Sequence, residues 1–170
     1  WSRFQTALHQ KAGLGEAQAS LSLLRRLGGI LRQGEWQVAA ILDLQTWDRP
    51  AAPPRLVDIL PASPLDTIPL WGAAIDIGTT TVTVWLVDLL SGKVVAQVAQ
   101  YNKQIARGED VVSRIISASK DGGGDQMRTL VLETINELLD QACKRVKADP
   151  PVTPRVIVKA TVVGNPARVR

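Results

Sequence analysis

The sequence predicts an α/β (α+β) chain in two small parts that a proline-rich linker separates. Three observations predict this organisation. Residues 1–49 hold leucines at helical spacing followed by a run rich in Val, Ile and Leu, which is typical of a small α+β module. Residues 50–70 are punctuated by prolines, which helix interiors and central strands exclude. Residues 71–170 follow a β-β-β-α-β pattern of alternating and helically spaced apolar residues.

Composition narrows the classes of function. The chain has 170 residues, 45% of them apolar, with a net charge of +4 and a pI of about 9.6. This length has room for one ordinary domain or two small ones. The basic charges are dispersed, and no aromatic platform accompanies the cluster near Lys144 and Lys147, so we expect no nucleic-acid partner. No apolar run reaches the roughly 18–20 residues that cross a bilayer, so we expect no membrane span.

The scarcity of cysteine and histidine excludes other kinds of site. Cys143 and His9 are the only residues of their types. A single cysteine forms no intrachain disulfide, which fits a cytoplasmic location, and an iron–sulfur cluster or a structural zinc needs several ligands. We expect Cys143 to be a small core residue and His9 a structural or surface residue. The chain begins at Trp1 with no signal-peptide pattern, so we expect a piece of a longer protein.

Within residues 1–49, Ala19–Gln33 has the apolar spacing of a helix, with Ser20 or Ser22 as its cap. Trp36–Leu44 predicts a strand, because it is rich in β-branched and aliphatic residues. Inside the linker, Leu56–Leu60 is a short extended piece and a candidate to pair with this module. Together these patterns predict a small, partial α+β domain.

From residue 71 onward the pattern predicts an antiparallel meander, two helices and a further strand. Ser91, Gly92 and Lys93 predict a tight turn between two of the strands. The expected strands are 72–77, 81–89, 94–100 and 155–163, and the expected helices are 109–119 and 126–146. The buried stripe of the long helix is expected at Leu130, Leu132, Ile135, Leu138, Leu139 and Ala142. The last strand would leave a free sheet edge.

The segment Asp76–Thr81, with sequence D-I-G-T-T-T, carries the chemistry. Gly78 removes a side chain where a ligand could approach the backbone, and Thr79, Thr80 and Thr81 place hydroxyls beside successive amides. Amides at a tight turn form an anion site, and a carboxylate such as Asp76 can hold hydrated Mg²⁺ beside a phosphate. The alternative is an ordinary turn in which the threonines serve β-propensity and Asp76 is a cap. We expect a phosphate-binding hairpin.

This segment and its surroundings resemble a known family. The segment looks like the first phosphate motif of the superfamily of acetate and sugar kinases, heat-shock chaperone ATPases and actin (ASKHA). Within it, the chain is most similar to the ATP-dependent reductive activators of corrinoid proteins, often described only as ferredoxin-like. The resemblance covers about residues 72–167, and more weakly residues 20–60. It rests on Ala74–Thr81, Leu86–Leu89 with Gly92, Asn102–Gln104, Gly108–Ile115 and Val162–Asn165.

The resemblance implies a fold and a reaction. Members carry an iron–sulfur domain, a linker, a middle domain and an ATPase domain whose ribonuclease-H-like fold begins β-β-β-α-β. Residues 1–49 would then be part of the middle domain, and residues 71–170 the first part of the ATPase domain. ATP hydrolysis, with Mg²⁺, is coupled to one-electron reduction of cobalt(II) to cobalt(I) in the corrinoid protein of a methyltransferase system. The chain is also a candidate to form a homodimer.

The resemblance assigns residues to the nucleotide site and leaves others open. Asp76, Gly78, Thr79, Thr80 and Thr81 would bind the first phosphate and Mg²⁺. Gly164 and Asn165 would either reach the nucleotide cleft or merely turn the chain. Gly108–Arg114 would either form part of the interdomain or nucleotide cleft or be a helix N-terminus capped by Asp110.

Departures from the family pattern also matter. The cysteines of the iron–sulfur cluster, the second phosphate loop and the adenosine-binding segment are absent from these residues, and Lys103 stands where the family commonly has Pro. We therefore expect the chain alone to be inactive as an ATPase. A kinase of the same superfamily acting on a small metabolite, or a non-catalytic interaction fragment, are the alternatives.

Overall fold

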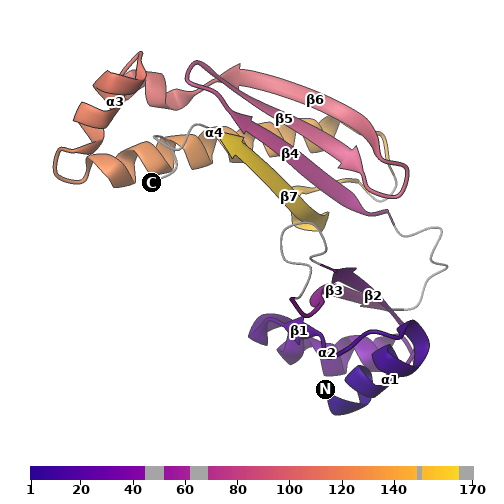
Figure 1. Ribbon diagram of the computed structural model, residues 1–170. Coiled ribbons are helices and arrows are strands. Elements are labelled where there is room, and N and C mark those ends of the chain that lie inside the picture. Colours follow the sequence, from indigo (N-terminus) through magenta and orange to yellow (C-terminus); the bar gives the residue numbers. More distant parts are fainter. Residues whose placement is uncertain (45–51, 62–68, 149–150, 165–170) are drawn as a thin grey trace. The chain divides into compact units, whose positions relative to one another are not determined.

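The structure is a computed structural model that describes residues 1–44, 52–61, 69–148 and 151–164. The chain divides into two compact units, residues 1–68 and 69–170. Each unit contains its own sheet and its own cluster of buried apolar side chains. The mixed α and β content confirms the α+β class at this level (Figure 1).

Unit 1 packs helices against a three-stranded sheet of order β1-β3-β2. Strand β3 is central, because it pairs in parallel with β1 and antiparallel with β2. The extended piece expected at Leu56–Leu60 lies in β3, so its pairing with this module is confirmed. The buried residues of its core cluster are Leu23, Leu27, Leu56 and Ile59. The elements are α1 (Ser2–Ala12), β1 (Gln18–Ala19), α2 (Leu21–Gln33), β2 (Val38–Asp43) and β3 (Arg55–Pro61).

Local signals fix the ends of α2. The Ser20 hydroxyl accepts a hydrogen bond from the Leu23 amide at 3.2 Å, so Ser20 is the predicted N-cap. Gly34 is the C-cap. The predicted strand start at Trp36 is wrong: Trp36 has φ 68°, in the left-handed region, and its side chain is 70% exposed. The strand begins only at Val38, once the chain has turned back from the helix.

Unit 2 is built on a four-stranded sheet of order β6-β5-β4-β7. The first three strands are an antiparallel meander, as predicted, and β7 pairs in parallel with β4. A parallel neighbour requires a crossover, which the segment between β6 and β7 provides with its two α-helices and two short 3-10 helices. The strands are β4 (Trp71–Ile77), β5 (Thr81–Asp88), β6 (Lys93–Tyr101) and β7 (Ile157–Gly164), and the helices are η2 (Lys103–Arg107), α3 (Val111–Ala118), α4 (Gly123–Arg145) and η3 (Pro154–Val156).

Helix α4 lies along one face of this sheet (Figure 1). The fully buried residues Val82, Val84 and Leu86 alternate along β5 and share a core cluster with Leu138 of α4. The predicted stripe is confirmed at Leu138 and Ala142, but it is wrong at Leu132, which is 45% exposed. Thr134 and Met127 lie on the buried face instead. None of the helices in the described ranges is long and apolar enough to cross a bilayer.

Strand β7 is the outer strand of the sheet in the described part of unit 2. Its residues from Lys159 to Gly164 are exposed, including Val162 and Val163. This matches the expectation of a free edge after the last strand. The two valines are therefore available to whatever continues or covers the sheet.

Candidate functional site

The candidate site is the turn between β4 and β5. Asp76 is the last exposed residue of β4, between the buried Ile75 and Ile77, so its side chain projects from the sheet face opposite α4. The Gly78 amide donates to the Thr81 carbonyl at 2.9 Å. A Cβ on Gly78 would lie 2.4 Å from that carbonyl oxygen, which is backbone, so only glycine closes this turn without displacing it.

Three successive carbonyls of the turn accept hydrogen bonds from residues outside it. The Asn102 side-chain amide donates to the Gly78 carbonyl at 2.9 Å, and the Asn102 backbone amide donates to the Thr80 carbonyl at 2.8 Å. Between them, the Arg114 Nη2 group donates to the Thr79 carbonyl at 2.6 Å. The turn therefore has a defined backbone conformation before any ligand binds.

The residues that hold the turn are polar and buried. Asn102, Gln104 and Arg114 are 0%, 3% and 4% exposed. The Gln104 side chain accepts from Asn102 Nδ2 at 3.3 Å, and its own amide donates to the Met127 carbonyl of α4 at 2.9 Å. Burying such groups is costly unless they are hydrogen-bonded, so each of them is tied into the turn or the helix beside it.

A capping box starts α3 and places Arg114. The Asp110 carboxylate accepts from the Ser113 amide at 2.8 Å, and the Ser113 hydroxyl accepts from the Asp110 amide at 3.3 Å. The hydrogen bond that the Asp110 carboxylate accepts from the Ser113 backbone amide is the main cause that holds the pKa of Asp110 below its ordinary value. Gly108 lies against this box, and a Cβ there would lie 2.8 Å from the Arg114 amide nitrogen. The prediction that Asp110 caps a helix here is confirmed. Arg114 of the same segment also contacts the turn, through its bond to the Thr79 carbonyl.

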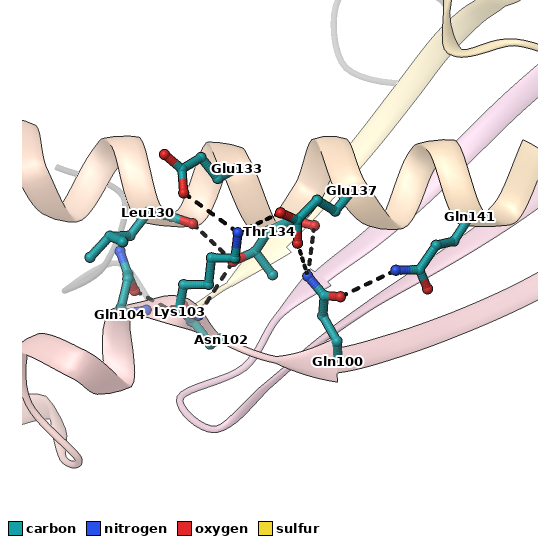
Figure 2. A network of polar contacts seen from close by, with 9 residues as sticks. All are labelled: Gln100, Asn102, Lys103, Gln104, Leu130, Glu133, Thr134, Glu137 and Gln141. Atoms are coloured by element: carbon teal, nitrogen blue, oxygen red, sulfur yellow. Dashed lines mark hydrogen bonds and ion pairs between the residues drawn. The ribbon is translucent and has the colours of Figure 1, made fainter.

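A second, exposed network ties the same region to α4 (Figure 2). Lys103 forms ion pairs with Glu133 and Glu137, and its backbone amide donates to the buried Thr134 hydroxyl at 3.3 Å. Gln100 of β6 also donates to Glu137 at 3.0 Å. The hydrogen bond with Glu137 raises the pKa of Lys103, and the same bond lowers the pKa of Glu137. Lys103 therefore has a structural role, because its contacts connect the start of η2 to α4.

The remaining predicted site residues fall in different places. Gly164, the last residue of β7, pairs with Ile77 and lies beside the end of β4 that leads into the turn. Asn165 lies outside the described residues. No group of three or more His, Cys, Asp or Glu side chains that could hold a metal occurs in the described ranges. A hydrated Mg²⁺ needs only one or two carboxylates beside a phosphate, and the exposed carboxylate of Asp76 has the chemistry for that role.

Sequence reasoning did not identify the buried holders of the turn as site residues. Asn102 and Gln104 enter the sequence analysis only through the resemblance, and Arg114 only as the end of the open segment Gly108–Arg114. Their burial is what marks them in the structure, and their polar sequence neighbours, such as Lys103 and Ser113, give no signal of it. The side-chain bonds of Asn102 and Arg114 to the turn reach 24 and 35 residues along the sequence, and one sequence contains no record of such distant contacts.

Comparison with protein families identifies the chain. Residues 71–169 match the model of the "RACo middle region", and residues 1–64 match that of the "RACo linker region". The chain belongs to the RACo family. In the terms of these models, unit 2 corresponds to the middle region and unit 1 to the linker region.

Two relatives show how much of a longer protein this chain matches. A corrinoid activation enzyme, RamQ of Eubacterium limosum, is 38% identical over 98 residues, which are 56% of this chain and 16% of that protein. The solved structure of a reductive activator for a corrinoid iron–sulfur protein is 35% identical, with a TM-score of 0.76, over 98% of this chain and 25% of that chain. The chain thus spans a sixth to a quarter of the length of these relatives.

Proposed function

We propose that this chain supplies the first phosphate-binding turn of an ATP-dependent reductive activator of corrinoid proteins. In that protein, ATP and Mg²⁺ drive a one-electron reduction of cobalt(II) to cobalt(I) in the corrinoid protein of a methyltransferase system. An iron–sulfur domain outside this chain is the electron donor. The names of both relatives support the corrinoid partner, and the turn supports the nucleotide.

The direction of the turn's peptide groups is the observation that carries the proposal. A trans peptide unit points its N–H opposite to its C=O. Because the Gly78 and Thr79 carbonyls point at the buried Asn102 and Arg114 side chains, the amides of Thr79 and Thr80 point away from that buried cluster. Successive amides that point away from the protein interior can donate hydrogen bonds to phosphate oxygens.

Asp76 supplies the second requirement of a nucleotide site. Its carboxylate is exposed at the end of β4, on the sheet face that α4 does not cover. A carboxylate repels phosphate directly but binds a hydrated Mg²⁺ that bridges to it. In the proposed site, Asp76 holds the metal and the amides of the turn hold the phosphate.

Substitution of Asp76 in the full-length activator tests this function. Asp76→Asn keeps the shape and removes the charge, and we expect ATP-dependent cobalt reduction to fall by roughly a hundredfold or more, as for loss of one electrostatic catalytic group. The visible spectrum of the iron–sulfur cluster serves as the check on folding and should be unchanged. Asp121→Asn, at an exposed position between the helices, is the matched control and should retain activity. Unchanged reduction by Asp76→Asn would remove Asp76 from the site.

A further inference from the structure

We propose that Arg114 is a positioning residue for the phosphate turn, and that its guanidinium group sets the direction of the Thr79–Thr80 peptide. This inference rests on the proposed function, because it concerns how the phosphate-binding turn is held. The residue that it adds belongs to α3, which lies outside the phosphate motif Asp76–Thr81. Arg114 is not expected to touch the nucleotide.

The contacts of Arg114 span three separate segments. Its Nε donates to the Gly108 carbonyl at 2.8 Å, its Nη2 donates to the Thr79 carbonyl at 2.6 Å, and its Nη1 lies 3.5 Å from the Gln104 Oε1 oxygen. All three acceptors are neutral oxygens. The guanidinium group is thus inserted between the start of α3, the buried Gln104 and the turn.

The chemistry of these contacts requires arginine. A guanidinium group is planar and presents its donors as a rigid fork, whereas a lysine ammonium is a single point on a flexible chain. Only the fork reaches the Gly108 and Thr79 carbonyls from one side chain with fixed directions. Arg114 is 4% exposed, and removing a charge from water is costly. An apolar side chain would fill this position without that cost, so the hydrogen bonds of the guanidinium group are the reason for an arginine here.

The Thr79 contact affects the face that would meet a phosphate. Since the Thr79 carbonyl is fixed by Arg114, the Thr80 amide of the same peptide unit is fixed in the opposite direction. A charged donor on the carbonyl also polarises the peptide group, which strengthens the N–H as a donor. Arg114 therefore contributes positive potential to an anion through the peptide, without a direct contact.

The position of Arg114 also joins the turn to α3. The residue lies one residue beyond Ser113 of the capping box, so the same box that starts the helix fixes the root of the side chain. A shift of α3 would displace the guanidinium group from the Thr79 carbonyl. Conversely, a phosphate bound at the turn would stabilise the observed position of α3. The α3 position and nucleotide occupancy are coupled in this arrangement.

Arg114→Lys in the full-length activator tests the role, because it keeps the positive charge and loses the fork. We expect the KM for ATP to rise roughly tenfold, as for loss of a hydrogen bond to a charged group, with kcat for cobalt reduction changed less than threefold. Hydrogen exchange of peptides covering residues 76–82, measured without nucleotide, should accelerate by about the same factor. Arg107→Lys, an exposed arginine in η2, is the matched control and should change neither quantity.

A second variant guards against a folding defect. If Arg114→Lys fails to fold, Arg114→Ala is measured with and without millimolar methylguanidinium, and a fall in the KM for ATP relative to an equal concentration of NaCl supports the proposal. Wild-type KM and wild-type exchange in folded Arg114→Lys, or no specific rescue of Arg114→Ala, would overturn it. If the wild type shows no ATP dependence, the proposed function fails, whereas the exchange measurement still decides whether Arg114 holds the turn.

Discussion

At the scale of single residues, two neighbouring glycines at the joint between α3 and α4 have opposite requirements. A Cβ on Gly123 would lie 2.1 Å from the Ser117 carbonyl oxygen, whereas a Cβ on Gly124 would meet nothing closer than 4.0 Å. Gly122, just before them, has φ 69° and is the N-cap of α4. The joint is therefore a close backbone contact at one glycine and open at the next.

Alanine substitutions separate these roles. Gly123→Ala must displace the backbone of α3, so we expect the free energy of unfolding of unit 2 to fall by about 1–3 kcal/mol, as for overpacked sites. Gly124→Ala should leave it unchanged or raise it by up to about 1 kcal/mol, because alanine is the better helix former. Urea titrations followed by circular dichroism measure both variants. Equal stability of the two variants would contradict the steric argument.

Single residues also show where prediction from sequence ends. Gly78 and Asp76 could be singled out because a glycine and a carboxylate after a buried strand have few ordinary roles. Asn102, Arg114 and Thr134 could not be assigned, because each of them is explained by a contact with a distant segment. Burial of a polar group follows from tertiary structure, and a single sequence does not contain it.

At the scale of elements, the Lys103 contacts join the end of β6 and the start of η2 to α4 (Figure 2). The pKa of Glu137 is lowered, so its contribution to stability is present above its unfolded-state pKa near 4.5 and is lost as pH falls through the lower, folded-state pKa. The pKa of Lys103 is raised, so its contribution is lost only above its ordinary value of 10.5. Between these two pH limits, the contribution of the Lys103–Glu137 pair to stability does not change with pH.

This window gives a test. Glu137→Gln should lower the melting temperature slightly at pH 6–9, and the difference from wild type should vanish as the pH falls well below 4.5. High salt should reduce the difference at pH 7, since the groups are partly exposed. Glu109→Gln serves as the exposed control. A difference that persisted undiminished at low pH would show that packing, and not the ion pair, is responsible.

The elements themselves were largely predictable. The bounds of β4, β5 and β6 were predicted to within one or two residues. Strand β4 was predicted as a short buried run and β5 from the alternation of its two faces. Helix α1 was missed, since Leu8 is its one buried residue and its sequence therefore has little apolar periodicity. Helix α4 begins at Gly123 and not at Gln126, because the start of a helix made of glycine carries no propensity signal.

At the scale of the whole molecule, the chain spans about a quarter of the length of the solved relative. The proposed nucleotide site needs further phosphate donors and an adenosine-binding segment, because one turn presents only part of the donors. We therefore expect the purified 170-residue chain to show no appreciable Mg²⁺-ATP hydrolysis in a phosphate-release assay, whereas the full-length activator should hydrolyse ATP. Robust turnover by the short chain would contradict the view that this turn is one part of a larger site.

The buried thiol of Cys143 is a natural reporter on the opening of the core of unit 2. It is the only cysteine in the chain, it lies in the core cluster between α4 and the sheet, and burial raises the pKa of its thiol. A thiol reagent can therefore modify it only when α4 lifts from the strands. The rate of modification measures how often that core opens, with no label introduced, and a change in that rate on adding nucleotide would show whether the turn and the core move together.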